Sequence, residues 1–223
     1  MDLSGNKKIL IGNAGFVELL ETFGSDLTVV NAARVSFAKE STEFNEKDGG
    51  LIRYLAKYNH ISPFFHPQIR FRIKMPIFVA REWYRHTVGL SRNEVSRRYV
   101  DDEPEFFVPT ICRARDPKLK QGSKTESVDN NTLCVTAMNE ATAKSLHMYK
   151  ALLEQGVCPE QARIILPQSM YTEFIETGSL AAYARICKLR LDPSAQKEIQ
   201  EYAQALLELL KPQFPVSWAA LCA

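Results

Sequence analysis

Alternating apolar and charged positions predict a strand near the middle of the chain. In residues 68–75, QIRFRIKM, two isoleucines and a phenylalanine alternate with two arginines and a lysine. This period of two is typical of a strand with one buried face. Residues 169–177, SMYTEFIET, are expected to form a second strand, and residues 15–24, GFVELLETFG, form a short amphipathic stretch that Gly24 closes.

Helical spacing of apolar residues predicts most of the remaining elements. Ser25 is placed as the N-cap of a helix over residues 26–37, and Pro76 suits the first turn of a helix over residues 76–86. Further helices are expected over residues 51–58, 131–155, 159–166, 179–190 and 193–210. The predicted inner positions are Leu133, Met138, Ala141, Leu146, Tyr149 and Leu153 in the long helix, and Ile199, Tyr202, Ala205, Leu206, Leu209 and Leu210 in the last one.

The order of these elements favours one domain. The chain shows no internal repeat and no low-complexity linker, and the polar residues 38–48 and 113–130 are expected to be loops. Helices mix with a few strands without regular βαβ alternation. Its 223 residues, 45% of them hydrophobic, suffice for one large core. We therefore expect a single α+β domain over residues 1–223.

Composition limits the classes of partner and the compartment. The 28 basic and 26 acidic residues leave a net charge of only +2, so a nucleic-acid surface is not indicated and any cationic site must be local. No apolar run approaches the roughly 20 residues of a membrane span, and no secretion signal is evident. The five cysteines are odd in number and form no CxxC pair. These features indicate a cytoplasmic protein with reduced thiols and no metal site.

Residues 81–99, REWYRHTVGLSRNEVSRRY, carry the most specific chemistry. They contain five arginines and no lysine, whereas a solvated helix face mixes lysine with glutamate. In a helix over residues 76–86, Glu82, Arg85 and His86 converge on one face near its C-terminal end. Guanidinium groups hold phosphate through paired hydrogen bonds, and serine hydroxyls complete such a cradle.

The structural alternative for this segment is a basic surface helix and turn. Two further arginines argue against it, because Arg163 in QARIILP and Arg190 in RICKLRLD lie in apolar contexts where a charge must be paired. A structural ion pair of Arg190 with Asp192 or Glu198 is the alternative for that residue. Taken together, the arginines predict an anion pocket for a nucleotide.

Several blocks, taken in order, resemble one enzyme family. Arg85-His86-Thr87 is followed by eight residues and then Ser96-Arg97-Arg98-Tyr99. The family motif is RHR, seven residues, a serine and an Arg-Tyr pair. The blocks GFVELL, AARVSF, HISPFFH, PIFVAREWYRH, ARIILP and KLRLDPSAQKEIQ are also similar to family blocks and span about residues 15–200. The chain resembles the flavin-dependent thymidylate synthases, the ThyX family.

The resemblance implies an activity, cofactors and an assembly. Enzymes of this family make dTMP from dUMP, with methylenetetrahydrofolate as one-carbon donor and NADPH as the source of a hydride that passes through FAD. They are homotetramers with active sites at subunit contacts, and each subunit has mixed helices and a small, mostly antiparallel sheet. Their partners are small molecules, without nucleic acid or membrane. No cysteine nucleophile is needed, because the pyrimidine is activated electrostatically.

The resemblance also implies roles for single residues. Arg190 is expected to be the catalytic residue, which stabilises negative charge on the N3, O2 and O4 edge of uracil so that C5 becomes nucleophilic. His60 matches a histidine near the nucleotide. The implied dUMP-binding set is Glu82, Trp83, Tyr84, Arg85, Glu94, Val95, Ser96, Arg97, Arg98, Arg163 and Arg190, with the 94–98 stretch partly from a neighbouring subunit. The implied FAD-binding set is Ser36, Ser62, Arg85, His86, Thr87, Glu94, Ser179, Ala181 and Arg185.

The departures from the family pattern cluster on the flavin side. Thr87 replaces the second arginine of RHR, and the spacer is one residue longer. Phe65 stands where an acidic residue is common, and Ser194 where a histidine commonly follows the activating arginine. Ser179, Ala181 and Arg185 stand where the family often has an asparagine, an arginine and a second asparagine. We therefore expect an intact pyrimidine site and altered flavin contacts, with Arg185 pairing with a flavin phosphate.

Three alternative functions remain open on the sequence. The first is a related C5-modifying enzyme, such as a UMP methylase or a dUMP hydroxymethylase, because one changed contact at the ribose 2′ position suffices to change the substrate. The second is a flavin-free homologue that only binds dUMP. The third is a nucleic-acid binding module, which the near-neutral net charge disfavours.

Overall fold

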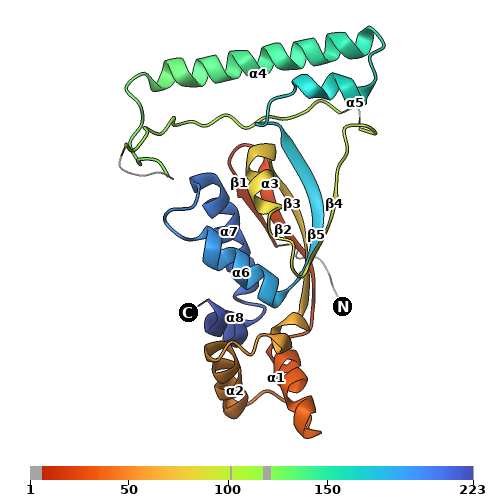
Figure 1. The fold of residues 1–223 in the computed structure, drawn as a ribbon, viewed down its shortest axis with the longest axis vertical. Coiled ribbons are helices and arrows are strands. Elements are labelled where there is room, and N and C mark those ends of the chain that lie inside the picture. The colour runs from red at the N-terminus through yellow and green to blue at the C-terminus, as the bar shows by residue number, and fades with distance from the viewer. Residues whose placement is uncertain (1–6, 101, 118–121, 223) are drawn as a thin grey trace.

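The computed structural model describes residues 7–100, 102–117 and 122–222, and a five-stranded sheet forms its centre in this described part (Figure 1). All neighbouring strands run antiparallel, in the order β1-β2-β3-β5-β4. The predicted α+β class with a small antiparallel sheet is therefore confirmed. The strands are β1 (Lys7–Ile11), β2 (Gly15–Phe23), β3 (Gln68–Pro76), β4 (Leu90–Glu94) and β5 (Tyr171–Ser179).

Most of the helices gather in three groups around this sheet, and α3 contacts β3 and α7. α6 and α7 pack together beside it, α1, α2 and α8 lie at one end, and α4 and α5 lie at the opposite end (Figure 1). The helices are α1 (Asp26–Arg34), α2 (Glu46–Lys57), α3 (Ile77–Trp83), α4 (Asn131–Glu154), α5 (Pro159–Ala162), α6 (Leu180–Arg190), α7 (Lys197–Leu210) and α8 (Pro215–Leu221). Short 3-10 turns are η1 (Val35–Phe37), η2 (Ser62–Phe65) and η3 (Arg163–Ile165).

The alternation seen in the sequence places β3 in the middle of the sheet. Ile69, Phe71 and Ile73 are fully buried, whereas Arg70 and Arg72 point to solvent. β2 and β5 pair with its two edges. α7 contacts the sheet at β1 and β2, and its six predicted inner positions are all buried. The core between the sheet and α7 is thus set by two sequence periods, one of two and one of 3.6 residues.

Helix starts follow local capping chemistry. The Ser25 side chain accepts a hydrogen bond from the backbone of α1, and the Thr28 side chain accepts one from the Ser25 backbone in return. This reciprocal pair satisfies amide groups that a helix N-terminus otherwise leaves unpaired. α2 has the same arrangement between Asn45 and Asp48. The predicted N-cap at Ser25 is confirmed, and α2 begins five residues earlier than predicted.

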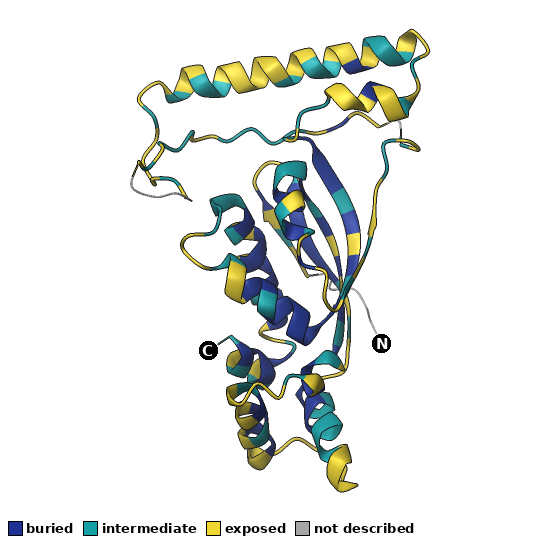
Figure 2. Ribbon diagram, viewed as in Figure 1, coloured by how far each residue is buried: buried dark blue, intermediate teal, exposed yellow. Residues whose placement is uncertain are grey.

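Other predicted boundaries are wrong. α3 ends at Trp83 instead of reaching His86. The amphipathic stretch before Gly24, for which no element type was predicted, is strand β2. α4 has the predicted extent, but Leu133 and Met138 are 68% and 45% exposed, and Tyr149 is its one buried residue. Figure 2 shows α4 mostly exposed along its length. Helical spacing alone does not tell whether an apolar face meets the chain's own core or another surface.

No helix in the described ranges is long and apolar enough to cross a membrane.

Candidate active site

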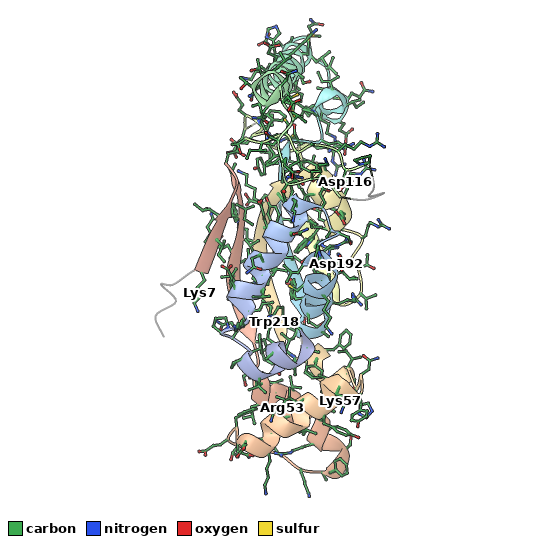
Figure 3. The ribbon with its side chains drawn as sticks, turned by 90° about the vertical axis from the view of Figure 1, so that its left-hand side faces the viewer. Lys7, Arg53, Lys57, Asp116, Asp192 and Trp218 are labelled. Atoms are coloured by element: carbon green, nitrogen blue, oxygen red, sulfur yellow. The ribbon has the colours of Figure 1, made fainter. Side chains whose placement is uncertain are left out.

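A cavity of about 670 Å³ lies where the C-terminal end of α6 meets the end of α3. The loop between α6 and α7 and two parts of the segment before α4 complete its wall. In Figure 3 the loop that carries Asp192 lies just below the segment that carries Asp116. The described lining residues are Glu82, Arg85, Arg113, Gly122, Ser123, Lys188, Leu189, Arg190, Asp192, Pro193, Ser194, Ala195, Gln196 and Lys197.

Arg190 is held at the wall of this cavity by two partners from the α3 region. Its Nε donates a hydrogen bond of 2.9 Å to Nε2 of His86. Its Nη1 forms an ion pair with the Glu82 carboxylate. Arg190 thus has an ion-pair partner, but not one of the two named from the sequence, since Asp192 accepts hydrogen bonds from Ser194 and Glu198 pairs with Arg113.

His86 is buried beside a cluster of cations. Burial, as the largest cause, and the positive charges of Arg190, Arg185, Arg92 and Arg85 together lower its pKa to about 4. The imidazole is therefore neutral at pH 7. Because Nε2 accepts from Arg190, the ring hydrogen resides on Nδ1.

Glu82 and His86 come together although they do not share a helix. α3 ends at Trp83, and the chain continues in a tight turn in which the amides of Arg85 and His86 donate to the carbonyls of Glu82 and Trp83 at 3.3 and 3.1 Å. The predicted grouping of Glu82, Arg85 and His86 is correct, but the predicted cause, a shared face of a helix over residues 76–86, is wrong. The turn keeps these residues close, and Arg190 links two of them from a distant helix.

The remaining predicted phosphate-binding residues lie elsewhere on the chain. None of the described residues that line the cavity comes from 94–98 or is Arg163. The amide and Nε of Arg98 donate to the Ser96 hydroxyl at 3.4 Å, and the Arg98 guanidinium pairs at 3.4 Å with Glu160 of α5. Arg163 is exposed on η3, directly after α5. Its expected burial among apolar residues is wrong, since Ile164 beside it is 76% exposed.

Several of the predicted dUMP-binding residues have structural contacts within this chain. Trp83 is fully buried, and its indole N–H donates to Glu176 at 3.3 Å. The Tyr84 ring packs edge-to-face on Phe174 with centroids 5.1 Å apart. In the 94–97 stretch, Glu94 accepts from Thr172, Val95 is 46% exposed, and Arg97 donates to the Asp102 carbonyl.

The predicted flavin-binding residues divide into exposed and buried groups. Ser36 and Ser62 are exposed on η1 and η2, which both contact α1, and Thr87 is exposed after α3. The guanidinium of Arg185 donates at 2.9 Å to the Val88 carbonyl. Exposed hydroxyl groups and guanidinium groups such as those of Arg85 and Arg185 are donors of the kind that suits a diphosphate. The buried group is Ser179, 1% exposed with its hydroxyl capping α6, and Ala181, 7% exposed.

Sequence reasoning missed two features of this region. Arg113 reaches the cavity from the segment before α4 and pairs with Glu198 of α7 at 2.7 Å. Arg92 of β4 pairs with the buried Glu176 of β5. Arg113 carried no signal because it lies in a polar stretch that reads as a loop. Arg92 and Glu176 stand opposite each other only because β4 and β5 pair.

Charged and polar side chains make up most of the described cavity lining. None of its described lining residues is a cysteine. Within the described ranges, no group of three or more histidine, cysteine, aspartate or glutamate side chains is arranged to hold a metal ion. The charged groups on the described lining are guanidinium, carboxylate and ammonium groups, and the cationic ones suit an anionic substrate.

Comparison with known proteins agrees with this reading. A family profile described as "Thymidylate synthase complementing protein", Thy1, matches residues 18–216. A flavin-dependent thymidylate synthase of Thermus thermophilus is 39% identical over 98% of this chain and 79% of its own length. One of Kosmotoga olearia is 40% identical over 96% of this chain and 92% of its own length.

A solved structure supports the same assignment at the level of the fold. The crystal structure of a UMP/dUMP methylase, PolB, from Streptomyces cacaoi bound with 5-Br dUMP matches with a TM-score of 0.84 and 31% identity. The match covers 95% of this chain and 96% of PolB. The profile match and the identities together show that the chain belongs to the Thy1 family, that of the flavin-dependent thymidylate synthases.

Proposed function

We propose that this chain converts dUMP to dTMP, with methylenetetrahydrofolate as the one-carbon donor and NADPH as the reductant through FAD. The observation that carries the proposal is the Arg190 guanidinium, which the Glu82 carboxylate and neutral His86 fix at the wall of the 670 Å³ cavity. Family membership and the names of the relatives support it.

Arg190 is suited to activate a pyrimidine without a covalent bond to the enzyme. A guanidinium that faces O2, N3 and O4 of uracil stabilises the negative charge that develops there when C5 attacks an electrophile. Because two partners already orient Arg190, little reorganisation is needed when this charge develops. Since no described lining residue is a cysteine, activation by a cysteine adduct is not the mechanism that the cavity supports.

FAD, when bound, supplies the hydride that completes the methyl group. The residues that would hold it are Ser36, Ser62 and Thr87, which offer exposed hydroxyls, and Arg85 and Arg185, which offer guanidinium donors. The buried positions Ser179 and Ala181 shape the base of α6 behind this surface. We therefore assign the diphosphate contacts to the exposed group.

We further propose that the active site forms in a homotetramer. The predicted dUMP residues fall into two sets in one chain, with Glu82, Arg85 and Arg190 at the cavity and the 94–98 stretch with Arg163 near α5. A second copy that brings its 94–98 stretch to this cavity would complete the phosphate cradle. The exposed apolar residues of α4, such as Leu133 and Met138, offer a surface for that contact.

The test is a reaction with dUMP, methylenetetrahydrofolate, NADPH and added FAD, with the product identified by mass. Formation of dTMP is expected, and Arg190→Ala is expected to abolish it while circular dichroism shows a retained fold. Absence of dTMP under conditions in which dUMP binds would contradict the proposal, and unchanged turnover of Arg190→Ala would remove Arg190 from the mechanism.

A second candidate is methylation of UMP, which the likeness to a UMP/dUMP methylase favours. The two candidate activities differ in the substrate, and one contact at the ribose 2′ position suffices to decide between dUMP and UMP. Measuring kcat/KM for dUMP and UMP in the same assay separates them. A preference for dUMP supports the thymidylate synthase, and equal or better use of UMP supports the methylase.

A further inference from the structure

The buried carboxylate of Glu176 holds together the turn that carries His86. Glu176 is fully buried in β5, and both of its oxygens lie 3.3 Å from the indole nitrogen of Trp83. It also forms an ion pair with Arg92, directly opposite on β4. Buried ion pairs stabilise a fold weakly when compared with apolar residues of similar size. Stability alone is therefore a poor reason for this pair.

Arg92 uses its second nitrogen to reach the turn. While Nε faces Glu176, Nη2 donates a hydrogen bond of 2.6 Å to the carbonyl of His86. The His86 amide is held on its other side by the Trp83 carbonyl at 3.1 Å. Glu176 therefore contacts both ends of the turn: it accepts a hydrogen bond from Trp83 directly, and it is linked to His86 through Arg92.

The turn that carries His86 also fixes the orientation of Arg190. The imidazole of His86 accepts the hydrogen bond from Arg190 Nε at 2.9 Å, so a shift of the His86 backbone displaces the acceptor. A misplacement of about 1 Å in a positioning group can lower turnover by about 100-fold. The contacts thus run without a gap from the sheet to the cavity wall.

We propose that Arg92 and Glu176 are positioning residues, which act on catalysis by fixing His86 and, through it, the Arg190 guanidinium. This inference rests on the proposed role of Arg190 in activating the pyrimidine. Neither residue is expected to touch the substrate, since neither lines the cavity among the described residues.

The chain offers a matched control for this pair. Arg72 of β3 pairs at 2.5 Å with Glu173, three residues before Glu176 on the same strand, and the Arg72 side chain is 48% exposed. This second arginine–glutamate pair joins neighbouring strands too, but it contacts neither His86 nor the cavity. Arg72→Lys therefore reports what the loss of an arginine fork on this sheet does by itself.

The test compares Arg92→Lys with Arg72→Lys in the full chain with FAD. Lysine keeps a charge opposite Glu176 but donates from a single nitrogen, so it lacks the two separate nitrogens with which Arg92 bonds Glu176 and the His86 carbonyl. For Arg92→Lys we expect kcat to fall by about 10- to 100-fold and the dUMP dissociation constant to change less than about threefold. We also expect the imidazole nitrogen NMR signals of His86 to show that the Nδ1–H tautomer is no longer the one populated. For Arg72→Lys we expect both readouts to match the wild type.

Each other outcome has a defined meaning. An unchanged kcat, or a reduced kcat with the His86 tautomer unaltered, overturns the positioning role. If Arg92→Lys does not fold, Glu176→Gln, whose amide oxygen still accepts from Trp83, is judged by the same two readouts. If Arg190→Ala keeps its turnover, the proposed function itself fails. If Arg190→Ala loses turnover while Arg92→Lys and Glu176→Gln keep normal turnover, only the positioning inference is overturned.

Discussion

Arg190 and His86 are joined by a single hydrogen bond of 2.9 Å that requires a neutral imidazole. The guanidinium has no lone pair to offer, so Nε2 of His86 must be the acceptor and must carry no proton. Burial and four nearby arginines enforce this state by lowering the pKa of His86 to about 4. Protonation of His86 thus removes the acceptor and places a like charge against Arg190.

Acid should destabilise the protein through this histidine. Between its ordinary pKa of about 6.5 and its folded pKa of about 4, the unfolded chain binds a proton that the folded chain excludes. The free energy of unfolding therefore falls as the pH drops from about 6.5 to about 4, by at most about 3 kcal/mol, and this contribution is complete below pH 4. Urea unfolding at several pH values measures it.

His86→Gln provides the control for this pH dependence. The Gln amide oxygen can still accept from Arg190 but does not titrate. We expect the pH slope of stability between 4 and 6.5 to be shallower in this variant, since the other titrating groups are shared. Parallel stability curves for the two proteins would mean that His86 is not the group responsible.

Mixed oligomers test whether two chains build each active site. Arg190→Ala and Arg98→Ala subunits are each expected to be inactive alone. If Arg98 acts at a neighbour's cavity, refolding them together in equal amounts restores about a quarter of the wild-type activity, because both functional residues then meet at about that share of the sites. Steady-state turnover of the mixture measures this recovery.

The same experiment has an internal control. Arg190 and Glu82 touch within one chain, so mixing Arg190→Ala with Glu82→Ala subunits creates no complete site and should restore nothing. Recovery in that control, or no recovery with Arg98→Ala, would contradict a site shared between chains in the proposed way.

The sequence predicted the elements whose burial is decided within one chain. The alternation in residues 68–75 and the helical spacing in α7 matched the structure because both apolar faces are buried in one hydrophobic core. The long helix α4 has a similar pattern, yet Leu133 is 68% exposed. Periodicity alone does not show whether such an apolar face is buried within the chain.

The grouping of Arg190 with Glu82 was predictable for a different reason. Arg190 and Glu82 lie 108 positions apart, and their grouping came from the rarity of arginines among apolar residues and from a family resemblance. The same reasoning failed to bury Arg163, because local sequence does not show whether isoleucines such as Ile164 face inward. Arg92 and Glu176 could not be paired in advance, since only the register of β4 with β5 brings them opposite.

Gly15 is expected to be intolerant of any side chain. It begins β2 after the turn from β1, and a Cβ there would lie 2.2 Å from the Tyr202 hydroxyl, 2.8 Å from the Ile11 carbonyl and 3.2 Å from the Lys74 carbonyl. Two of these neighbours are backbone atoms in the sheet, which cannot rotate away. Gly15→Ala should lower the free energy of unfolding by about 1–3 kcal/mol in thermal or urea unfolding. Gly50→Ala, with nothing within 4 Å, is the control and should not be destabilised by contact.

Arg185 is expected to hold the flavin at the position where the family usually has an uncharged amide. Its guanidinium donates one N–H to the Val88 carbonyl at 2.9 Å, and its other N–H groups can donate to an anion. A charge-assisted contact with the flavin diphosphate is worth about 1.5–3 kcal/mol, so Arg185→Ala should weaken FAD binding by at least about 10-fold in a fluorescence titration of the apoprotein. Arg53→Ala, which removes an exposed guanidinium on α2, should leave FAD affinity unchanged. Arg185→Lys separates charge from geometry, because it keeps the cation but loses the planar fork, and we expect an intermediate affinity. Equal FAD affinity of wild type and Arg185→Ala would show that the guanidinium only braces Val88 and that the flavin phosphates are bound by other groups.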